Sequence, residues 1–104
     1  HVIHTVGPVW KGGTLGEHDL LASCYRRSLE LCQQHALASV AFPAISTGIY
    51  RFPAKLAAGI AVATIADALP SAVSVTRVIF CCFSPDSGRL HEEAVAALGR
   101  PCAD

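Results

Sequence analysis

The chain has 104 residues, which is enough for one small domain. Hydrophobic residues make up 52% of it and charged residues only 15%, which excludes a disordered chain, because disorder requires low hydrophobicity and high net charge. Eight Lys and Arg residues balance eight Asp and Glu residues, so the charge provides no patch for nucleic acids and none for a membrane surface.

The first predicted elements are a strand over residues 1–6, which Gly7 and Pro8 end, and a helix from about Glu17 to His35. The helix is indicated by residues that recur at helical spacing and form one face. They are Leu21, Cys24, Tyr25, Ser28, Leu29 and Cys32. Because the chain starts inside a strand and not at a Met, we expect it to be part of a longer domain.

A second strand is predicted over residues 39–44 and a second helix over residues 53–69. Pro53 favours a helix start, since the N–H that it lacks would have no partner there, and the helix has to stop before Pro70. The apolar residues of this helix extend most of the way round it, which predicts deep burial. A helical glycine costs about 1 kcal/mol relative to Ala, so Gly59 is expected to allow close packing against the sheet.

The third strand is predicted over residues 75–83, where a continuous apolar run is typical of a parallel strand covered on both faces. Ser84 and Pro85 start a last helix that extends to about Leu98, and residues 99–104 are predicted to be a loose tail. Strands that alternate with helices predict an α/β fold with a mostly parallel sheet. Ligands of such sheets bind beyond the carboxyl ends of the strands, which indicates residues 7–16, 43–53 and 84–88.

The cysteines indicate free thiols, because their number is odd and no two form a C-x-x-C pair. They are Cys24, Cys32, Cys81, Cys82 and Cys102. Cys81 and Cys82 belong to the apolar run of the third strand and are predicted to be buried. Free thiols are typical of a reducing compartment, so we expect a cytoplasmic protein.

A membrane span is not expected. The apolar residues 57–66 are bracketed by Lys55 and Asp67, and they fall short of the roughly 18 residues that a span needs. The N-terminus also lacks the pattern of a signal peptide.

The loop over residues 43–53 is the most informative stretch, because it joins a buried strand to a helix N-terminus. Backbone N–H groups around Ser46–Ile49 can point outward together, Gly48 permits close approach of a ligand oxygen, and the helix dipole favours negative charge. Ser46 and Thr47 add hydroxyl donors. The residues therefore predict a cradle for a diphosphate, with Tyr50 and Phe52 as an apolar wall for a sugar. A plain strand–turn–helix connection is an equal alternative at this point.

The histidines and serines outside this loop indicate no other chemistry. His1 and His4 are three apart in a predicted strand, so they point to opposite faces, and His4 is predicted to be packed. Ser46 lacks the G-x-S-x-G context of a hydrolase nucleophile, and His91 is assigned to the polar side of the last helix. We therefore predict no metal site, no cofactor and no catalytic residue in this chain.

Two segments resemble macro domains. Positions 43–50 read Pro-Ala-Ile-Ser-Thr-Gly-Ile-Tyr, which is similar to the phosphate-binding loop of that family, and residues 1–10 resemble the strand before it. Residues 78–84 resemble the last core strand. The resemblance implies a three-layer α/β/α fold with a mostly parallel sheet, of which residues 1–104 form the second half as a single partial domain, the N-terminal half being absent.

The resemblance also implies a ligand of the ADP-ribose class. The residues that match the family's diphosphate and ribose contacts are Ser46, Thr47, Gly48, Ile49 and Tyr50. Phe83 matches the residue that lies against the adenine, and a core Phe is an equal alternative for it. The family's Gly-rich catalytic loop and its Asn-bearing strand have no counterpart, and the sequence contains no Asn.

Three functions follow from this resemblance. The first is binding of ADP-ribose by a domain whose intact form hydrolyses ADP-ribosyl or O-acetyl-ADP-ribose esters. The second is a non-catalytic ADP-ribose reader, and the third is a remnant without ligand function. In the family, the Asn-bearing strand lies between the strands that match residues 1–6 and 39–44. We therefore expect this chain to be unstable alone and to be completed by a complementing segment or chain.

Overall fold

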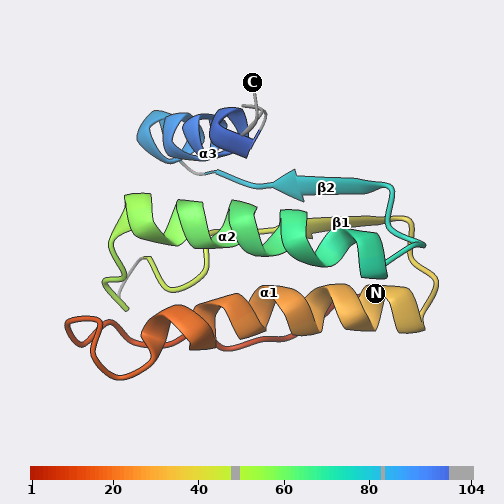
Figure 1. Cartoon of the computed structure of the whole chain (residues 1–104), viewed down its shortest axis with the longest axis horizontal. Coiled ribbons are helices and arrows are strands. Elements are labelled where there is room, and N and C mark those ends of the chain that lie inside the picture. Colours follow the sequence, from red (N-terminus) through yellow and green to blue (C-terminus); the bar gives the residue numbers. More distant parts are fainter. Residues whose placement is uncertain (48–49, 83, 99–104) are drawn as a thin grey trace.

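The computed structural model describes residues 1–47, 50–82 and 84–98, and it confirms the α/β class. In chain order the elements are α1 (Glu17–Gln34), β1 (Ser39–Phe42), α2 (Ala54–Ala68), the 3-10 helix η1 (Leu69–Ser71), β2 (Arg77–Phe80) and α3 (Pro85–Leu98) (Figure 1). Strands β1 and β2 pair in parallel, with Ser39 opposite Arg77 and Phe42 opposite Phe80. The predicted tail over residues 99–104 lies outside the described residues.

The helix boundaries follow the local signals closely. Helix α1 ends at Gln34, and α2 ends two residues before Pro70, which lies in η1. Helix α3 begins at Pro85, where the Ser84 hydroxyl accepts a hydrogen bond of 3.1 Å from the N–H of Ser87. Both strands are four residues long and therefore shorter than predicted.

The core lies between α1, α2 and the two strands. The predicted face of α1 is confirmed, because all six of its residues are buried. The ring of Tyr25 packs against Phe42, with their centroids 5.0 Å apart, and burial raises the pKa of Tyr25 to about 12. Helix α2 contributes Ala57, Ile60, Ala61 and Ile65 to the same core.

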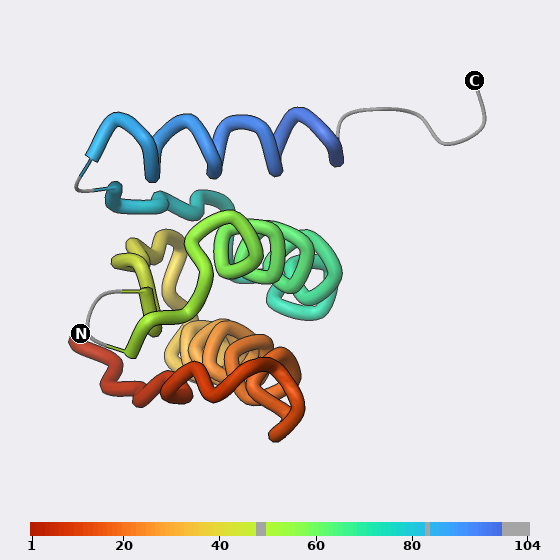
Figure 2. Tube along the Cα trace, turned by 90° about the vertical axis from the view of Figure 1, so that its left-hand side faces the viewer, coloured from red at the N-terminus to blue at the C-terminus, as the bar shows by residue number. Residues whose placement is uncertain are grey.

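The sheet is covered on one face. Helices α1 and α2 lie side by side on the same side of the strands, and α3 packs against α2 beside β2 (Figures 1 and 2). Strand residues that face the helices belong to the core or pack on it: Val40, Phe42, Val78 and Phe80. The alternate residues Ser39, Ala41, Arg77 and Ile79 are exposed. The described ranges thus supply the sheet and one helical side of a three-layer fold.

Residues 1–10 do not form the strand that was predicted over residues 1–6. The segment runs alongside α1, where the Cys24 thiol donates to the Val6 carbonyl at 3.4 Å (Figure 2). A groove of about 360 Å³ separates it from β1. Paired strands lie about 4.8 Å apart, so the two backbone edges on either side of the groove cannot form a ladder with each other. The strand prediction was wrong because it assumed a neighbour that the described residues do not provide.

Other burial predictions were wrong for a related reason. Cys81 is exposed and Cys82 only half-buried, since the ladder ends at Phe80 and one sheet face is open. His4 is exposed because its segment lies outside the sheet. Gly59 is exposed on α2, and a Cβ added there would meet no atom within 4 Å, so close packing does not explain it.

Helix α2 corrects the expectation about membrane spans. The 18 residues Ala54–Ser71 have a mean hydropathy of 1.2, which by length and composition alone is enough to cross a membrane. The core helix of a soluble protein passes the same test. In this fold α2 contributes buried residues to the core and packs against α1 and α3.

The carboxylate of Glu17 organises the loop before α1. It is 2% exposed, and it accepts hydrogen bonds from the backbone N–H groups of Lys11 (2.8 Å), Gly13 (2.9 Å) and Leu15 (2.7 Å). These bonds, with the largest effect from Lys11, lower the pKa of Glu17 to about 2, although burial opposes the shift. Glu17 therefore fixes the path of the chain directly after Trp10.

Glu17→Gln is expected to loosen this loop. The lowered pKa means that the charged carboxylate stabilises the fold fully above its ordinary pKa of 4.5, and that this contribution is lost as the pH falls toward about 2. An amide cannot accept from all three donors, because its nitrogen is itself a donor. We expect faster hydrogen exchange at Lys11, Gly13 and Leu15 in the variant, and a weaker pH dependence of stability between pH 5 and 2. Equal exchange rates in both proteins would contradict this role.

Candidate functional site

The candidate site is a cavity of about 170 Å³ at the carboxyl ends of β1 and β2. Its walls come from the loop after β1, the first turns of α2 and α3, and one residue of α1. The lining residues are Tyr25, Ala44, Ile45, Thr47, Ala54, Ala57, Ala58, Ser84, Ser87 and His91. The position agrees with the rule that parallel sheets bind ligands beyond their carboxyl ends.

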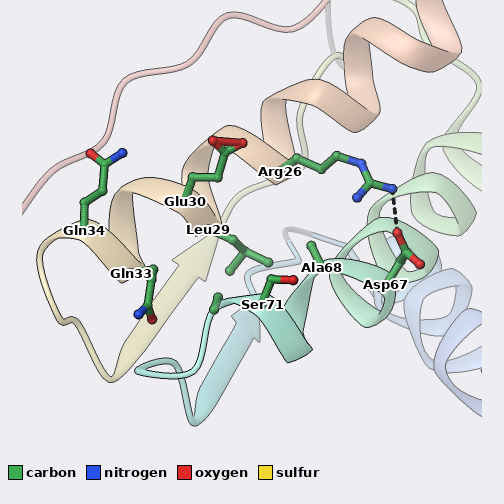
Figure 3. A pocket seen from close by; sticks show the side chains of 9 residues that line it. Arg26, Leu29, Glu30, Gln33, Gln34, Asp67, Ala68 and Ser71 are labelled. Atoms are coloured by element: carbon green, nitrogen blue, oxygen red, sulfur yellow. Dashed lines mark hydrogen bonds and ion pairs between the residues drawn. The ribbon is translucent and has the colours of Figure 1, made fainter.

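A larger groove at the other end of α1 and α2 is a weaker candidate. It has a volume of about 460 Å³, and several of its polar side chains already have partners within the fold (Figure 3). Arg26 and Asp67 form an ion pair of 2.8 Å, and the side-chain oxygen of Gln33 accepts a hydrogen bond from the N–H of Ser74. We therefore place the chemistry in the smaller cavity.

Ser46 is the most unusual residue of the site loop. It has a φ of 66°, in the left-handed region that costs a non-glycine residue about 1–3 kcal/mol. It is 9% exposed, and its hydroxyl is buried without a hydrogen-bond partner within the described part of the chain. Backbone strain and an unpaired buried donor both concentrate at ligand sites. Ser46 lies between two residues that line the cavity, Ile45 and Thr47, and its own hydroxyl lies against Gly7.

Of the other residues predicted to contact the ligand, the structure describes Thr47 and Tyr50. Thr47 is half-buried and lines the cavity, and no acceptor among the described residues pairs with its N–H or with that of Ser46. Tyr50 is half-buried, and its carbonyl accepts a hydrogen bond of 2.8 Å from Trp10. Gly48, Ile49 and Phe83 lie outside the described residues, so their assigned contacts stay predictions.

Two further contacts hold the loop in shape. The N–H of Phe52 donates to the Ser46 carbonyl at 2.9 Å, which closes the loop on itself. The ring of Phe52 is buried against Trp10, with centroids 4.8 Å apart. Phe52 is thus part of the support under the loop and not an open wall for a sugar, while Arg51 is exposed.

Gly7 supports the loop from the N-terminal segment. A Cβ at this position would collide with the Ser46 hydroxyl and with a methyl group of Ile45. Gly7 was predicted to end a strand and to begin the ligand-side stretch 7–16, but its contact with Ser46 was not predicted, because it joins segments almost 40 residues apart.

His91 was also missed. Its Nδ1–H donates to the Ser87 carbonyl at 2.8 Å, and its ring lies 5.3 Å from that of Phe80. The Cys82 sulfur is 3.6 Å from the same nitrogen. Helix α3 starts at the site, and residues four apart on a helix share a face. Because Ser87 lines the cavity, His91 does so too, and it does not lie on the polar side of the helix.

A metal is not suggested by this arrangement. Across the ranges that the structure describes, no three His, Cys, Asp or Glu side chains come close enough to hold an ion. The polar groups of the cavity are hydroxyls and one imidazole, which bind ligands through hydrogen bonds.

Comparison with known proteins identifies the family. The Macro domain family model matches residues 1–61, which is more than half of the chain. The chain belongs to the Macro domain family. The resemblance that was based on the loop over residues 43–50 is thereby confirmed.

This macro domain chain is similar to several bacterial proteins. A macro domain-containing protein of Mesorhizobium japonicum is 56% identical over 98 residues, covering 94% of this chain and 56% of the relative. An O-acetyl-ADP-ribose deacetylase of Citrobacter koseri is 47% identical over 98 residues, covering 94% of this chain and 55% of the relative. The chain thus spans slightly more than half the length of these relatives.

Solved macrodomains confirm the fold. The Oceanobacillus iheyensis macrodomain with ADP has a TM-score of 0.80 and 40% identity, covering 91% of this chain and 50% of the other. The Trypanosoma brucei macrodomain in complex with ADP-ribose has a TM-score of 0.78 and 33% identity, covering 88% and 38%.

Proposed function

We propose that this chain binds ADP-ribose or its derivatives through the loop over residues 43–53. The observation that carries the proposal is Ser46, whose strained backbone and unpartnered buried hydroxyl stand at the head of that loop. The cavity lined by its neighbours Ile45 and Thr47 borders the N-termini of α2 and α3, where helix dipoles favour an anion such as a diphosphate. Similar macrodomains with ADP and with ADP-ribose support this ligand class.

Gly48→Val is expected to abolish ADP-ribose binding without unfolding the domain. A branched side chain at this loop position would occupy the space that a phosphate needs. Isothermal titration with ADP-ribose measures the effect, and circular dichroism checks the fold. Normal binding by Gly48→Val would refute the loop assignment. Millimolar or absent affinity in the folded parent chain would instead favour the remnant hypothesis.

We propose further that the complete protein hydrolyses ADP-ribosyl or O-acetyl-ADP-ribose esters and that this chain alone only binds them. The Citrobacter koseri relative is named a deacetylase, and this chain covers 55% of it. Ser46 has no His or carboxylate partner among the described side chains, so it is not activated as a nucleophile. Release of acetate from O-acetyl-ADP-ribose should occur with the complete protein and not with this chain. A complete protein that binds without turnover would favour the reader hypothesis.

We also propose that a strand from a complementing segment or chain fills the groove between residues 1–5 and β1. The groove has the open edge of β1 as one wall and His1, Ile3, His4 and Thr5 on the other side. Unpaired backbone groups at such an edge gain hydrogen bonds when a strand is added. Adding the part of the Mesorhizobium japonicum relative that this chain does not match should slow hydrogen exchange in Ser39–Phe42. A sharp, cooperative melt of the isolated monomer would contradict the need for completion.

The described cysteines support a cytoplasmic location, which we propose as well. Cys24, Cys32, Cys81 and Cys82 are all free thiols. Fractionation of cells that express the complete protein tests this proposal.

A further inference from the structure

We propose that His91 is a pH-dependent binding residue for the diphosphate of the nucleotide, on the α3 side of the cavity. The inference rests on the proposed function and adds a contact from outside the loop over residues 43–53. His91 is half-buried, and its ring lines the cavity together with Thr47, Ser84 and Ser87.

The hydrogen bond to Ser87 determines which ring nitrogen is available. A carbonyl can only accept, so Nδ1 carries a proton in both charge states of the ring. Nε2 is therefore the nitrogen that titrates, and it is the one left for a ligand. It is an acceptor when the imidazole is neutral and a charged donor when the ring is protonated. Only the protonated form can donate a charge-assisted hydrogen bond to a phosphate oxygen.

Among the lining residues that the structure describes, the cavity around His91 contains no charged side chain that would neutralise or repel a protonated ring. No carboxylate and no other cation line the cavity within the described ranges. The titratable groups that face it are the Cys82 thiol after β2 and the Tyr25 phenol from α1, both of which are neutral acids in their ordinary forms. Helix α2 and the loop after β1 present Ala54, Ala57 and Thr47, which do not titrate.

The charged side chains of α3 do not pair with His91 or line the cavity. Asp86 is paired with Arg89 at 3.0 Å and both are exposed, while Glu92 and Glu93 point to solvent. A protonated His91 would be the single full positive charge among the described lining residues, beside two helix N-termini that already favour an anion.

The direct test is an NMR titration of the His91 ring signal in the whole chain. ADP-ribose is the suitable ligand because its diphosphate carries no terminal monoester, whose second pKa of about 6 would titrate in the same range. By linkage, a ligand that binds better to protonated His91 raises its pKa. We expect ADP-ribose at saturation to raise the pKa of His91, and adenosine to leave it unchanged.

Three results would overturn the inference. A pKa that ADP-ribose leaves unchanged would refute it while the proposed function stands. An equal shift with adenosine would place His91 against the base and not the phosphates. Absence of ADP-ribose binding at every pH would overturn the proposed function together with it.

Affinity measurements give a second test. Only the protonated ring can donate to the diphosphate, and a hydrogen bond to a charged group is worth about 1.5 kcal/mol, so we expect ADP-ribose to bind up to about tenfold more tightly at pH 5.5 than at pH 8. His91→Gln keeps a donor that does not titrate and should make this ratio about one. His35→Gln is the matched control, because His35 is exposed just after the end of α1, beside the ring of His1, and should keep the parent ratio. A His91→Gln variant with the parent pH dependence would refute the role.

Discussion

Gly7→Ala is expected to destabilise the chain by about 1–3 kcal/mol and to abolish ADP-ribose binding. The added Cβ would collide with the Ser46 hydroxyl and an Ile45 methyl group, and both side chains are buried. Neither can withdraw without moving the backbone of the site loop, because both are enclosed and the colliding atoms are bonded directly to Cβ. Urea denaturation measures the loss of stability, and titration with ADP-ribose measures the loss of binding.

Gly59→Ala is the matched control for this prediction. An alanine normally stabilises a chain relative to glycine by about 0.4–1 kcal/mol, because it restricts the unfolded state. Gly59 lies in α2, and its added Cβ meets nothing within 4 Å, so the control should become more stable and bind ADP-ribose normally. The opposite signs separate the collision at Gly7 from the general effect of the substitution. Gly7→Ala with unchanged stability and affinity would refute the contact between the two segments.

Ser46→Gly is expected to raise stability and lower affinity at the same time. Glycine adopts a φ of 66° without strain, and the variant also removes a buried hydroxyl that has no partner within the described residues. Relief of strain of about 1–3 kcal/mol should therefore increase the free energy of unfolding. Loss of a hydrogen bond to a charged ligand, about 1.5 kcal/mol, should weaken ADP-ribose binding about tenfold.

Ala36→Gly is the control that isolates the backbone effect. Ala36 has a φ of 52° and is exposed between α1 and β1, at the opposite end of the strand from the site. Its replacement should relieve similar strain and leave the affinity for ADP-ribose unchanged. If Ser46→Gly binds as tightly as the parent chain, the hydroxyl of Ser46 is not held for the ligand. If Ser46→Gly is less stable, the proposed strain is absent.

Local patterns predicted the helices well because the signals for a helix lie within it. The face of α1 from Leu21 to Cys32 and the prolines around α2 depend on residues a few positions apart, and the structure confirms these elements. The parallel pairing of β1 with β2 followed from the same alternation of elements. The loop over residues 43–50 was recognised because its residue order is continuous and specific to a family.

The sequence by itself determined the α/β class and the family, and it indicated the loop over residues 43–53 as the candidate ligand site, since each of these is encoded in neighbouring residues. The tertiary structure alone decided which elements meet at that stretch. It left residues 1–6 outside the sheet, placed Gly7 beneath Ser46 and brought His91 from α3 to the cavity. Pairing of strands and lining of cavities depend on contacts between distant segments, and no local pattern of residues specifies those.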